Sequence, residues 1–400
     1  MLAGMNRAKF TSRSPGRIVA IRLGEGQSVD GFVPHPLPPR LSLTMDMASL
    51  LSRAENLLGR LDGMTDALPD PSILVRAFIR REAAISSYIE DTFAAYEDIG
   101  LVENDPETSQ RKVQVREVYN AERVIEFSVT AIRDNDRDIT PALLKEMHSL
   151  LLRGVATDAD VVGDYRKKPV FIGKRSLGYQ QARYVPPPPT FVPELIDQLC
   201  DFMLRDAGLA PLISNAVTHY QFEAIHPFED GNGRLGRALV LVKLCRDACL
   251  RLPVLNPSLF FESHREEYYD ALLAVSQSGD WAGWIQFFVR GMIYAAEDAI
   301  GRVQAIRKLM EKYHRELHRA RTSVLLLGLV DQLFVYPRIT ISMAAKIMGI
   351  TKEAARKHVD RLVVAGILSE ITGQPTNRIF VARDILASVR VTPTRRSSNT

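Results

Sequence analysis

The stretch HPFEDGNGRLGR, residues 226–237, contains a histidine, two carboxylates, three glycines, an asparagine and two arginines. Pro227 ends the preceding helical pattern, so this stretch predicts a loop and a new helix that begins near Gly233. Gly231, Asn232 and Gly233 permit positive φ and close backbone approach, and the free N–H groups of the new helix lie beside them. We interpret this loop as an anion-binding site.

The charged residues of the stretch indicate which anion it would bind. Arg234 and Arg237 are separated by three residues in the first turn of the helix and can clamp phosphate oxygens by paired hydrogen bonds. Asp230 is a hard oxygen donor suited to Mg²⁺ (or Mn²⁺) that bridges phosphates. His226 can act as a general base, because a neutral imidazole takes a proton from an attacking hydroxyl near pH 7. Together these residues predict a phosphoryl-transfer site.

Helical patterns surround this site. Apolar residues at helical spacing predict a long amphipathic helix from Ser72, with Pro71 as its opener. Another helix is expected from Thr140, its cap, to Gly154. Between them and the motif, PVFI and ARYV are separated by glycines and followed by four prolines, which predicts one exposed β-hairpin. The expected fold is mainly α.

The end of the chain has a different pattern. SMAAKIMGITKEAARKHVDRL resembles a helix-turn-helix with Gly349 in the turn and Thr351 as a cap, and the following GQPTN suits a winged version. The second helix is basic through Lys352, Arg356, Lys357 and Arg361. Contact with DNA and contact with protein both stay open, and packing or protein contact is favoured.

The motif resembles that of the Fic-domain family, HxFx[D/E]GNGRxxR, and matches it in full at His226, Phe228, Asp230, Gly231, Asn232, Gly233, Arg234 and Arg237. Similarity extends to FVPHPLPP, to the expected hairpin and to PSLFFESHREEYYDALLAV. The resemblance implies a protein adenylyltransferase, a mainly helical enzyme that transfers AMP from ATP to a Ser, Thr or Tyr hydroxyl and releases pyrophosphate. It gives His226 the role of base and Asp230 that of Mg²⁺ ligand. Asn232 with the glycines would orient the α- and β-phosphates, and the two arginines would bind the outer phosphates.

The same resemblance implies an inhibitory helix. Some members of the family have a pattern [S/T]xxxE[G/N], whose glutamate pairs with the second arginine of the motif and blocks the γ-phosphate site. Ser86 and Glu90 fit it here, while Asp91 stands where Gly or Asn is usual. The expected enzyme is therefore autoinhibited by a pair between Glu90 and Arg237, and a reverse, AMP-removing activity is open. The hairpin is expected to hold an extended target segment by β-augmentation.

These patterns give an expected domain organisation. Its ranges are 1–30, a flexible N-terminus; 31–135, an N-terminal helical region with the inhibitory helix; 136–300, the Fic catalytic core; 301–320, a linker helix; 321–390, the winged helix-turn-helix; and 391–400, a flexible tail.

Two other functions are weighed against this one. His219, Glu223 and His226 fall at i, i+4 and i+7 and could form a metal site of a hydrolase, although the spacing is not HExxH. A DNA-binding transcriptional regulator with a nucleotide-sensing Fic-like domain is the main alternative. Loss of a motif residue would favour it, and none is lost.

Composition excludes several classes. The formal net charge of +4 over 400 residues is too small to indicate nucleic-acid binding by the whole chain. No apolar run is long enough to cross a membrane. Cys200, Cys245 and Cys249 lack CxxC spacing and are expected to be free thiols in a reducing cytoplasm. The basic start is expected to be flexible, with a transit peptide as the alternative. The target protein, the nucleotide preference and the oligomeric state, a homodimer included, stay open.

Overall fold

The computed structural model describes most of the chain, namely residues 5–24, 27–66, 71–94, 113–155, 161–173, 178–205, 208–319, 323–374 and 377–389. Four expected features lie wholly or partly outside these ranges. They are the flexible tail at 391–400, the tip of the central hairpin at 174–177, residues 95–99 of the expected long helix, and residues 375–376 of the expected wing.

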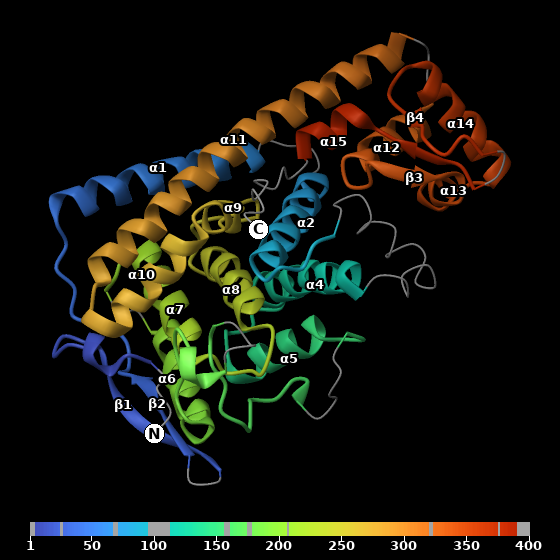
Figure 1. Ribbon diagram of the computed structural model, residues 1–400. Helices are drawn as coiled ribbons and strands as arrows, with labels where there is room; N and C mark the ends of the chain where they lie inside the picture. The colour runs from blue at the N-terminus through green and yellow to red at the C-terminus, as the bar shows by residue number, and fades with distance from the viewer. Residues whose placement is uncertain are drawn as a thin grey trace, which may run out of the picture.

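Helices make up most of the described structure, as expected from the sequence (Figure 1). Those before the C-terminal unit are α1 (Met45–Asp66), α2 (Ser72–Ile89), α4 (Val113–Arg133), α5 (Pro141–Leu151), α6 (Val192–Leu204), α7 (Pro211–Ile225), α8 (Asn232–Arg246), α9 (Ser258–Ser263), α10 (Arg265–Ser278) and α11 (Trp281–Arg319). Short 3₁₀ helices lie at Arg7–Lys9, Tyr179–Gln181 and Pro189–Phe191.

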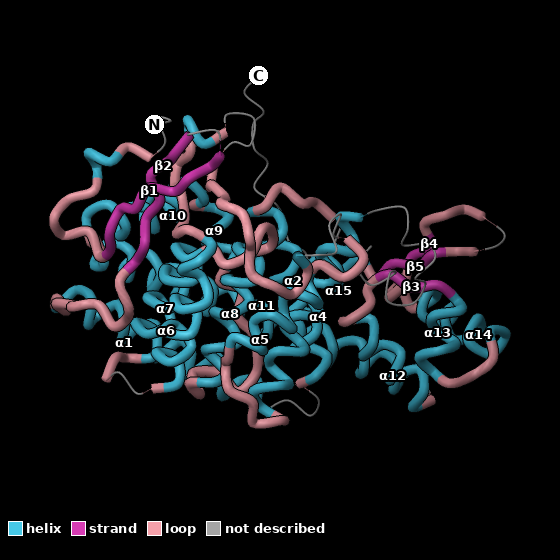
Figure 2. The backbone as a smooth tube through the Cα atoms, turned by 90° about the horizontal axis from the view of Figure 1, so that it is seen from below, coloured by secondary structure: helices cyan, strands magenta, loops and turns pink. Residues whose placement is uncertain are grey.

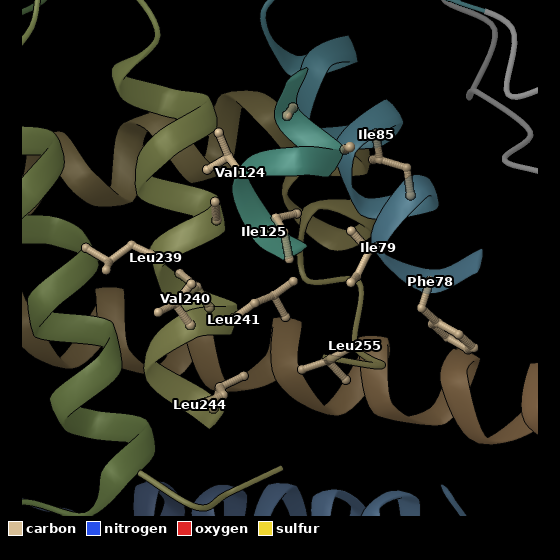
Figure 3. Packing of buried hydrophobic residues seen from close by; sticks show 14 of the residues in the cluster. Phe78, Ile79, Ile85, Val124, Ile125, Leu239, Val240, Leu241, Leu244 and Leu255 are labelled. Carbon is tan, nitrogen blue, oxygen red and sulfur yellow. The ribbon is translucent and has the colours of Figure 1, made fainter. Parts of the chain in front are cut away.

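Helix α8, which follows the motif loop, lies in the centre of the hydrophobic core. Its residues Leu239, Val240 and Leu241 are almost completely buried. Phe78 and Ile85 of α2, Val124 of α4 and Leu255 pack in the same region (Figure 3). Nearly all of α8 is buried, its polar residues Arg234, Arg237 and Lys243 included. The motif loop is therefore fixed to a rigid, buried element.

Helix α5 forms as the sequence predicts. Thr140 caps its start, because the side-chain oxygen accepts a hydrogen bond from the N–H of Leu143, and Pro141 occupies the first turn. Gly154, expected to close this helix, lies just beyond its end with φ of 71°.

The N-terminal segment differs from the expectation of a flexible stretch up to residue 30. Strands β1 (Gly16–Gly24) and β2 (Gln27–Pro34) form an antiparallel hairpin in which Ile18 faces Phe32. Val29 and Phe32 are fully buried, and the N–H of Phe32 donates to the carbonyl of Val185. The expectation was wrong here because this hairpin is stabilised by contacts with residues more than 150 positions away.

The region expected to hold one exposed hairpin contains less strand than predicted. Its described residues include a single antiparallel bridge, between Ile172 and Tyr184. The four prolines that follow, from Pro186 to Pro189, cannot donate to a ladder, which limits pairing on that side.

The long helix α11 crosses the boundary expected at residue 300. It runs unbroken for 39 residues, beside α1, and reaches the C-terminal unit (Figure 1). Val303, Ile306 and Tyr313 remain buried, so its apolar stripe continues through the segment expected to be a separate linker. Among the described helices, none is apolar over enough of its length to cross a membrane.

The C-terminal unit contains α12 (Val324–Leu333), β3 (Arg338–Thr340), α13 (Ile341–Met348), α14 (Lys352–Val364), β4 (Ser369–Glu370), β5 (Ile379–Val381) and α15 (Arg383–Val389). The strands form a small antiparallel sheet in the order β3-β5-β4, at the opposite end of the molecule from β1 and β2 (Figure 2). Gly349 ends α13 with φ of 65°, and Thr351 caps α14 by accepting from the N–H of Ala354. The local turn and cap predicted between these helices are therefore present.

The C-terminal unit contacts helix α2. Arg80 donates to the carbonyl of Val335 at 2.8 Å and forms a buried two-bond ion pair with Glu122 of α4. Arg76 donates to the hydroxyl of Tyr336 at 3.1 Å. Helix α2 thus joins the central helices to the end of the chain.

Candidate active site

His226 lies at the point where α7 ends. Its backbone is in the left-handed region, with φ of 50° and ψ of 64°, and its N–H donates to the carbonyl of Phe222. A non-glycine residue in this region is strained and needs support from its surroundings. Arg166 supplies it, because its Nε–H donates to the His226 carbonyl at 2.8 Å and its backbone N–H donates to the Pro227 carbonyl.

The same environment keeps the imidazole neutral. Burial, reinforced by the Arg166 guanidinium, lowers the pKa of His226 to about 4, although Glu90 and Asp230 act in the opposite direction. The backbone carbonyl of Glu223, beside the ring, opposes the shift as well. A neutral imidazole that borders the cleft has the properties of a proton acceptor.

Gly231 and Asn232 shape the loop. Gly231 has φ of 78°, and a β-carbon there would meet Leu151 at 2.8 Å. The Asn232 side chain accepts from the N–H of Phe228 and donates to its carbonyl, each at 2.9 Å. Because both the amide oxygen and the amide nitrogen are hydrogen-bonded within the loop, the Asn232 side chain stabilises the loop conformation. Its backbone N–H could bind a phosphate.

His148 supports the loop from below, and the sequence reasoning missed it. Its ring stacks on Phe228 with centroids 3.9 Å apart. Nδ1 accepts from the N–H of Gly163, so Nε2 carries the proton and donates to the Asp230 carbonyl at 3.2 Å. Burial lowers the pKa of His148 to about 4, which keeps the ring neutral. Nothing in the sequence of α5 distinguishes His148 from an ordinary packing residue.

The first arginine of the motif is already paired. Arg234 donates to Glu117 of α4 at 2.8 Å and to Asp230 at 3.3 Å. Glu117 also accepts from the Thr92 hydroxyl. The sequence did not identify Glu117, because a glutamate in an amphipathic helix has no local feature that distinguishes it from a surface residue. It ties the motif to the segment that follows α2.

The second arginine contacts the end of α2. Arg237 donates from Nε to the Ser86 hydroxyl at 2.8 Å, and from Nη2 to the Ser86 carbonyl at 2.9 Å and the Glu90 carboxylate at 2.7 Å. Arg237 is 1% exposed and Glu90 37%. The Glu90 carboxylate also lies directly over Gly233, where any β-carbon would collide with it. It therefore occupies space above the start of α8.

The end of α2 has the geometry that presents Glu90 in this way. The expected long helix stops at Ile89, and Glu90 is its C-cap residue. The N–H groups of Asp91 and Thr92 donate to the carbonyls of Tyr88 and Ser87, which is a Schellman motif.

Asp91 adopts the left-handed conformation that this motif requires, with φ of 57°. Gly and Asn reach this conformation most easily, and Asp reaches it at a modest cost. The Asp91 carboxylate pairs with Arg265 of α10 at 2.9 and 3.3 Å. Asp91 therefore contacts a different arginine from Glu90 and leaves the contact between Glu90 and Arg237 intact.

A cleft and a smaller cavity meet at these residues. The cleft, of about 570 Å³, runs along the motif loop and the residues before Ile172, including Lys168 and Phe171. The cavity, of about 130 Å³, adjoins it and is lined mainly by apolar surface from α7 and α10. Glu90, Ile172, His226 and Gly233 border both. A ligand with a polyanionic part and an apolar part could occupy both spaces.

The donor set at the cleft fits a divalent cation held together with phosphates. Asp230 borders the cleft, and its side chain is 59% exposed. Mg²⁺ is usually held by one or two carboxylates, with substrate phosphates and water completing its octahedron. Asp230 alone is consistent with that arrangement.

The alternative metal site is not supported. Within the described ranges, no three His, Cys, Asp or Glu side chains gather as metal ligands. His219 instead lies between the Tyr268 hydroxyl, at 2.8 Å, and the Gly236 carbonyl, at 3.2 Å. Burial lowers the pKa of His219 to about 3, so it is a neutral packing residue.

Comparison with known proteins gives matches over the same region. The profile of the Fic/DOC family matches residues 138–244, and that of the Fic/DOC family N-terminal region matches residues 48–130. A probable protein adenylyltransferase of Aquifex aeolicus is 27% identical over 181 residues, which are 45% of this chain and 53% of the relative. Protein adenylyltransferase Fic of Aedes aegypti is 26% identical over 245 residues, covering 57% of this chain and 44% of the relative. The chain thus spans about half the length of these relatives.

A solved structure shows the fold. The crystal structure of a Fic family protein from Desulfovibrio desulfuricans aligns with a TM-score of 0.54 at 20% identity, covering 86% of this chain and 98% of the other. The profiles, the relatives and this fold lead to one conclusion: the chain contains a Fic/DOC family domain, preceded by the N-terminal region of that family.

Proposed function

We propose that this protein is an adenylyltransferase that transfers AMP from ATP to a Ser, Thr or Tyr hydroxyl of a protein. The observation that carries the proposal is the complete motif loop, in which a neutral His226 borders both a cleft along an anion-binding helix start and an apolar cavity. The names of the relatives, all protein adenylyltransferases, support it.

In the proposed reaction, His226 takes the proton from the target hydroxyl. The hydroxyl oxygen attacks the α-phosphorus of ATP, the bond from that phosphorus to the bridging oxygen breaks, and pyrophosphate leaves. AMP remains on the target oxygen, and the imidazolium returns its proton to water or to the leaving group. The backbone N–H groups at the start of α8, with Gly231, Asn232 and Gly233, would orient the α- and β-phosphates. Arg234 and Arg237 would bind the outer ones.

Asp230 would hold Mg²⁺ or Mn²⁺, which would neutralise charge on the phosphates. The pair between Asp230 and Arg234, at 3.3 Å, keeps the carboxylate at the cleft.

We propose that the described conformation is autoinhibited through Ser86 and Glu90. The Glu90 carboxylate binds Arg237 and lies over Gly233, so it competes with a γ-phosphate for both the charge and the space. ATP would then be excluded or held with its α-phosphate out of line. A reverse activity that removes AMP, with Glu90 engaged, is part of this proposal.

The remaining expectations are also proposals. Residues 136–300 would form the catalytic core and 321–390 a winged helix-turn-helix that binds a protein or DNA through the exposed basic side chains of α14. The segment before Ile172, which borders the cleft, would hold the target peptide. The free thiols of Cys200, Cys245 and Cys249 fit a cytoplasmic location.

Incubation with α-labelled ATP and Mg²⁺ or Mn²⁺ tests the proposal. Label on the protein itself or on lysate proteins is expected, weak for wild type and stronger for Glu90→Gly. The purified protein should take up none from γ-labelled ATP, because pyrophosphate leaves. His226→Ala should abolish the label while leaving nucleotide binding largely intact, since loss of a positioned base costs about 10² to 10⁴ in rate. If nucleotide binds with no transfer by any variant, a nucleotide-sensing regulator is the better description.

A further inference from the structure

Glu223 is an unexplained carboxylate beside the candidate active site. It lies on α7, one turn before His226, and lines the smaller cavity. Its Oε1 is buried and has no hydrogen-bond partner. A buried polar atom without a partner costs free energy, so its retention calls for an explanation.

The other polar side chains of the cavity do have partners. Within the part of the chain that the structure describes, these are the pairs Arg183 with Asp270, Tyr184 with the Ala224 carbonyl, Tyr220 with Ser276, Tyr268 with His219, Tyr269 with Arg265, and Arg237 with Glu90. Besides Glu223, only the Nδ1 of His226 is a buried, unpaired polar atom among the lining residues. Because His226 serves the reaction, Glu223 is the group left to meet a ligand.

The fold makes room for this carboxylate. A β-carbon at Gly236 would collide with Glu223 Oε1, so the carboxyl group rests directly against the backbone of α8. The neighbouring turn repeats the arrangement, with Glu90 over Gly233. Glu90 lies at the border with the cleft, whereas Glu223 does not border the cleft. The two carboxylates would therefore face different parts of a bound nucleotide.

The part that Glu223 would meet follows from the layout of the site. Phosphates belong at the motif loop in the cleft, so the nucleoside belongs in the adjoining cavity, which is walled by Tyr268, Tyr269, Leu272 and Leu273. These residues offer apolar contact without preference for one base. Burial raises the pKa of Glu223 to about 7, against the effect of Arg237, so its carboxyl group can both donate and accept hydrogen bonds near neutral pH.

We propose that Glu223 is the specificity-determining residue of this site and selects ATP by hydrogen bonding to a polar group of its nucleoside. The inference rests on the proposed transferase function. The group is either the amino-bearing edge of the base or a ribose hydroxyl, since both offer the same hydrogen-bonding chemistry.

Nucleotide binding to the full chain tests this. The background is Glu90→Gly with His226→Ala, which frees the site and prevents turnover. Dissociation constants are measured for ATP, ITP, 2′-deoxy-ATP and 3′-deoxy-ATP, with Glu223 intact, as Glu223→Ala and as Glu223→Gln. A site built around a hydrogen bond rejects an analogue that lacks it, so ATP should bind about tenfold or more tightly than one analogue. Weaker binding of ITP would identify the base as the group that Glu223 binds. Weaker binding of a deoxynucleotide would identify a ribose hydroxyl.

Glu223→Ala should abolish this preference, while Glu223→Gln, which keeps a donor and an acceptor, should retain most of it. Ser276→Ala is the matched control, because it removes a cavity hydroxyl that is already paired, and it should leave the preference unchanged. An unchanged preference in Glu223→Ala, or an equal loss for all four nucleotides, overturns the inference. Failure of every nucleotide to bind the background protein would instead refute the proposed function.

Discussion

Replacing Glu90 by glycine removes the carboxylate that Arg237 binds in the described conformation. An exposed ion pair is worth up to about 1 kcal/mol, and breaking a buried one costs about 3–5 kcal/mol. This pair joins an arginine that is 1% exposed to a glutamate that is 37% exposed, so its worth lies between these limits. We take the free energy of this ion pair as about 2–3 kcal/mol. At about 1.4 kcal/mol for each factor of ten, this corresponds to a change of about 30–150-fold.

The predicted consequence is a rise of that size in the initial rate of labelling from α-labelled ATP. Three further variants separate the causes. Glu90→Gln keeps a side chain of the same size over Gly233 but removes its charge. Its initial rate of labelling should therefore lie between those of wild type and Glu90→Gly. The double variant Glu90→Gly with Arg237→Ala should label more slowly than Glu90→Gly alone, because the single change acts by freeing Arg237 to bind phosphate. Asp91→Asn is the matched control, since it removes the adjacent carboxylate, which binds Arg265 and not Arg237.

Equal labelling by wild type and Glu90→Gly, at matched ATP and metal, would refute the reasoning. A rise in Asp91→Asn as large as that in Glu90→Gly would also refute it, because disturbance of the helix end would then explain both. Circular dichroism of each variant checks that the fold is retained.

Three other predictions concern the metal, pH and stability. Asp230→Ala should abolish transfer and the Mg²⁺ dependence of ATP binding together, and binding that still responds to Mg²⁺ in titration calorimetry would contradict its role. In Glu90→Gly, the acidic limb of the pH–rate profile should lie below pH 5. Burial keeps the pKa of His226 near 4, and loss of Glu90 removes an effect that raises this pKa. An acidic limb near pH 6.5 would mean that the base is solvated or is another group. Glu122→Gln should lower the free energy of unfolding by about 3 kcal/mol, since it leaves the Arg80 charge buried without its counter-ion, whereas Glu146→Gln, in an exposed pair, should leave the urea midpoint unchanged.

The sequence alone predicted local structure correctly wherever residues adjacent in the chain determine it. The loop at His226, the cap at Thr140 and the turn at Gly349 depend on a few adjacent residues, and all three formed as predicted. The mainly helical fold also followed, because apolar spacing along a helix does not depend on what lies opposite. The resemblance to a known motif then supplied the expected contact between Glu90 and Arg237.

Other features depend on residues that are distant in sequence, and only the tertiary structure decided them. The hairpin of β1 and β2 is stabilised through Phe32, which is buried against residues near Val185. His148, Arg166 and Glu117 support the loop from other elements, and their sequence context resembles that of ordinary surface or packing residues. Glu223 was considered only as a metal ligand from its spacing. Its unpaired oxygen became visible once α8 and α10 enclosed it, because burial, which turns a common glutamate into a group that needs a partner, is a property of the assembled fold.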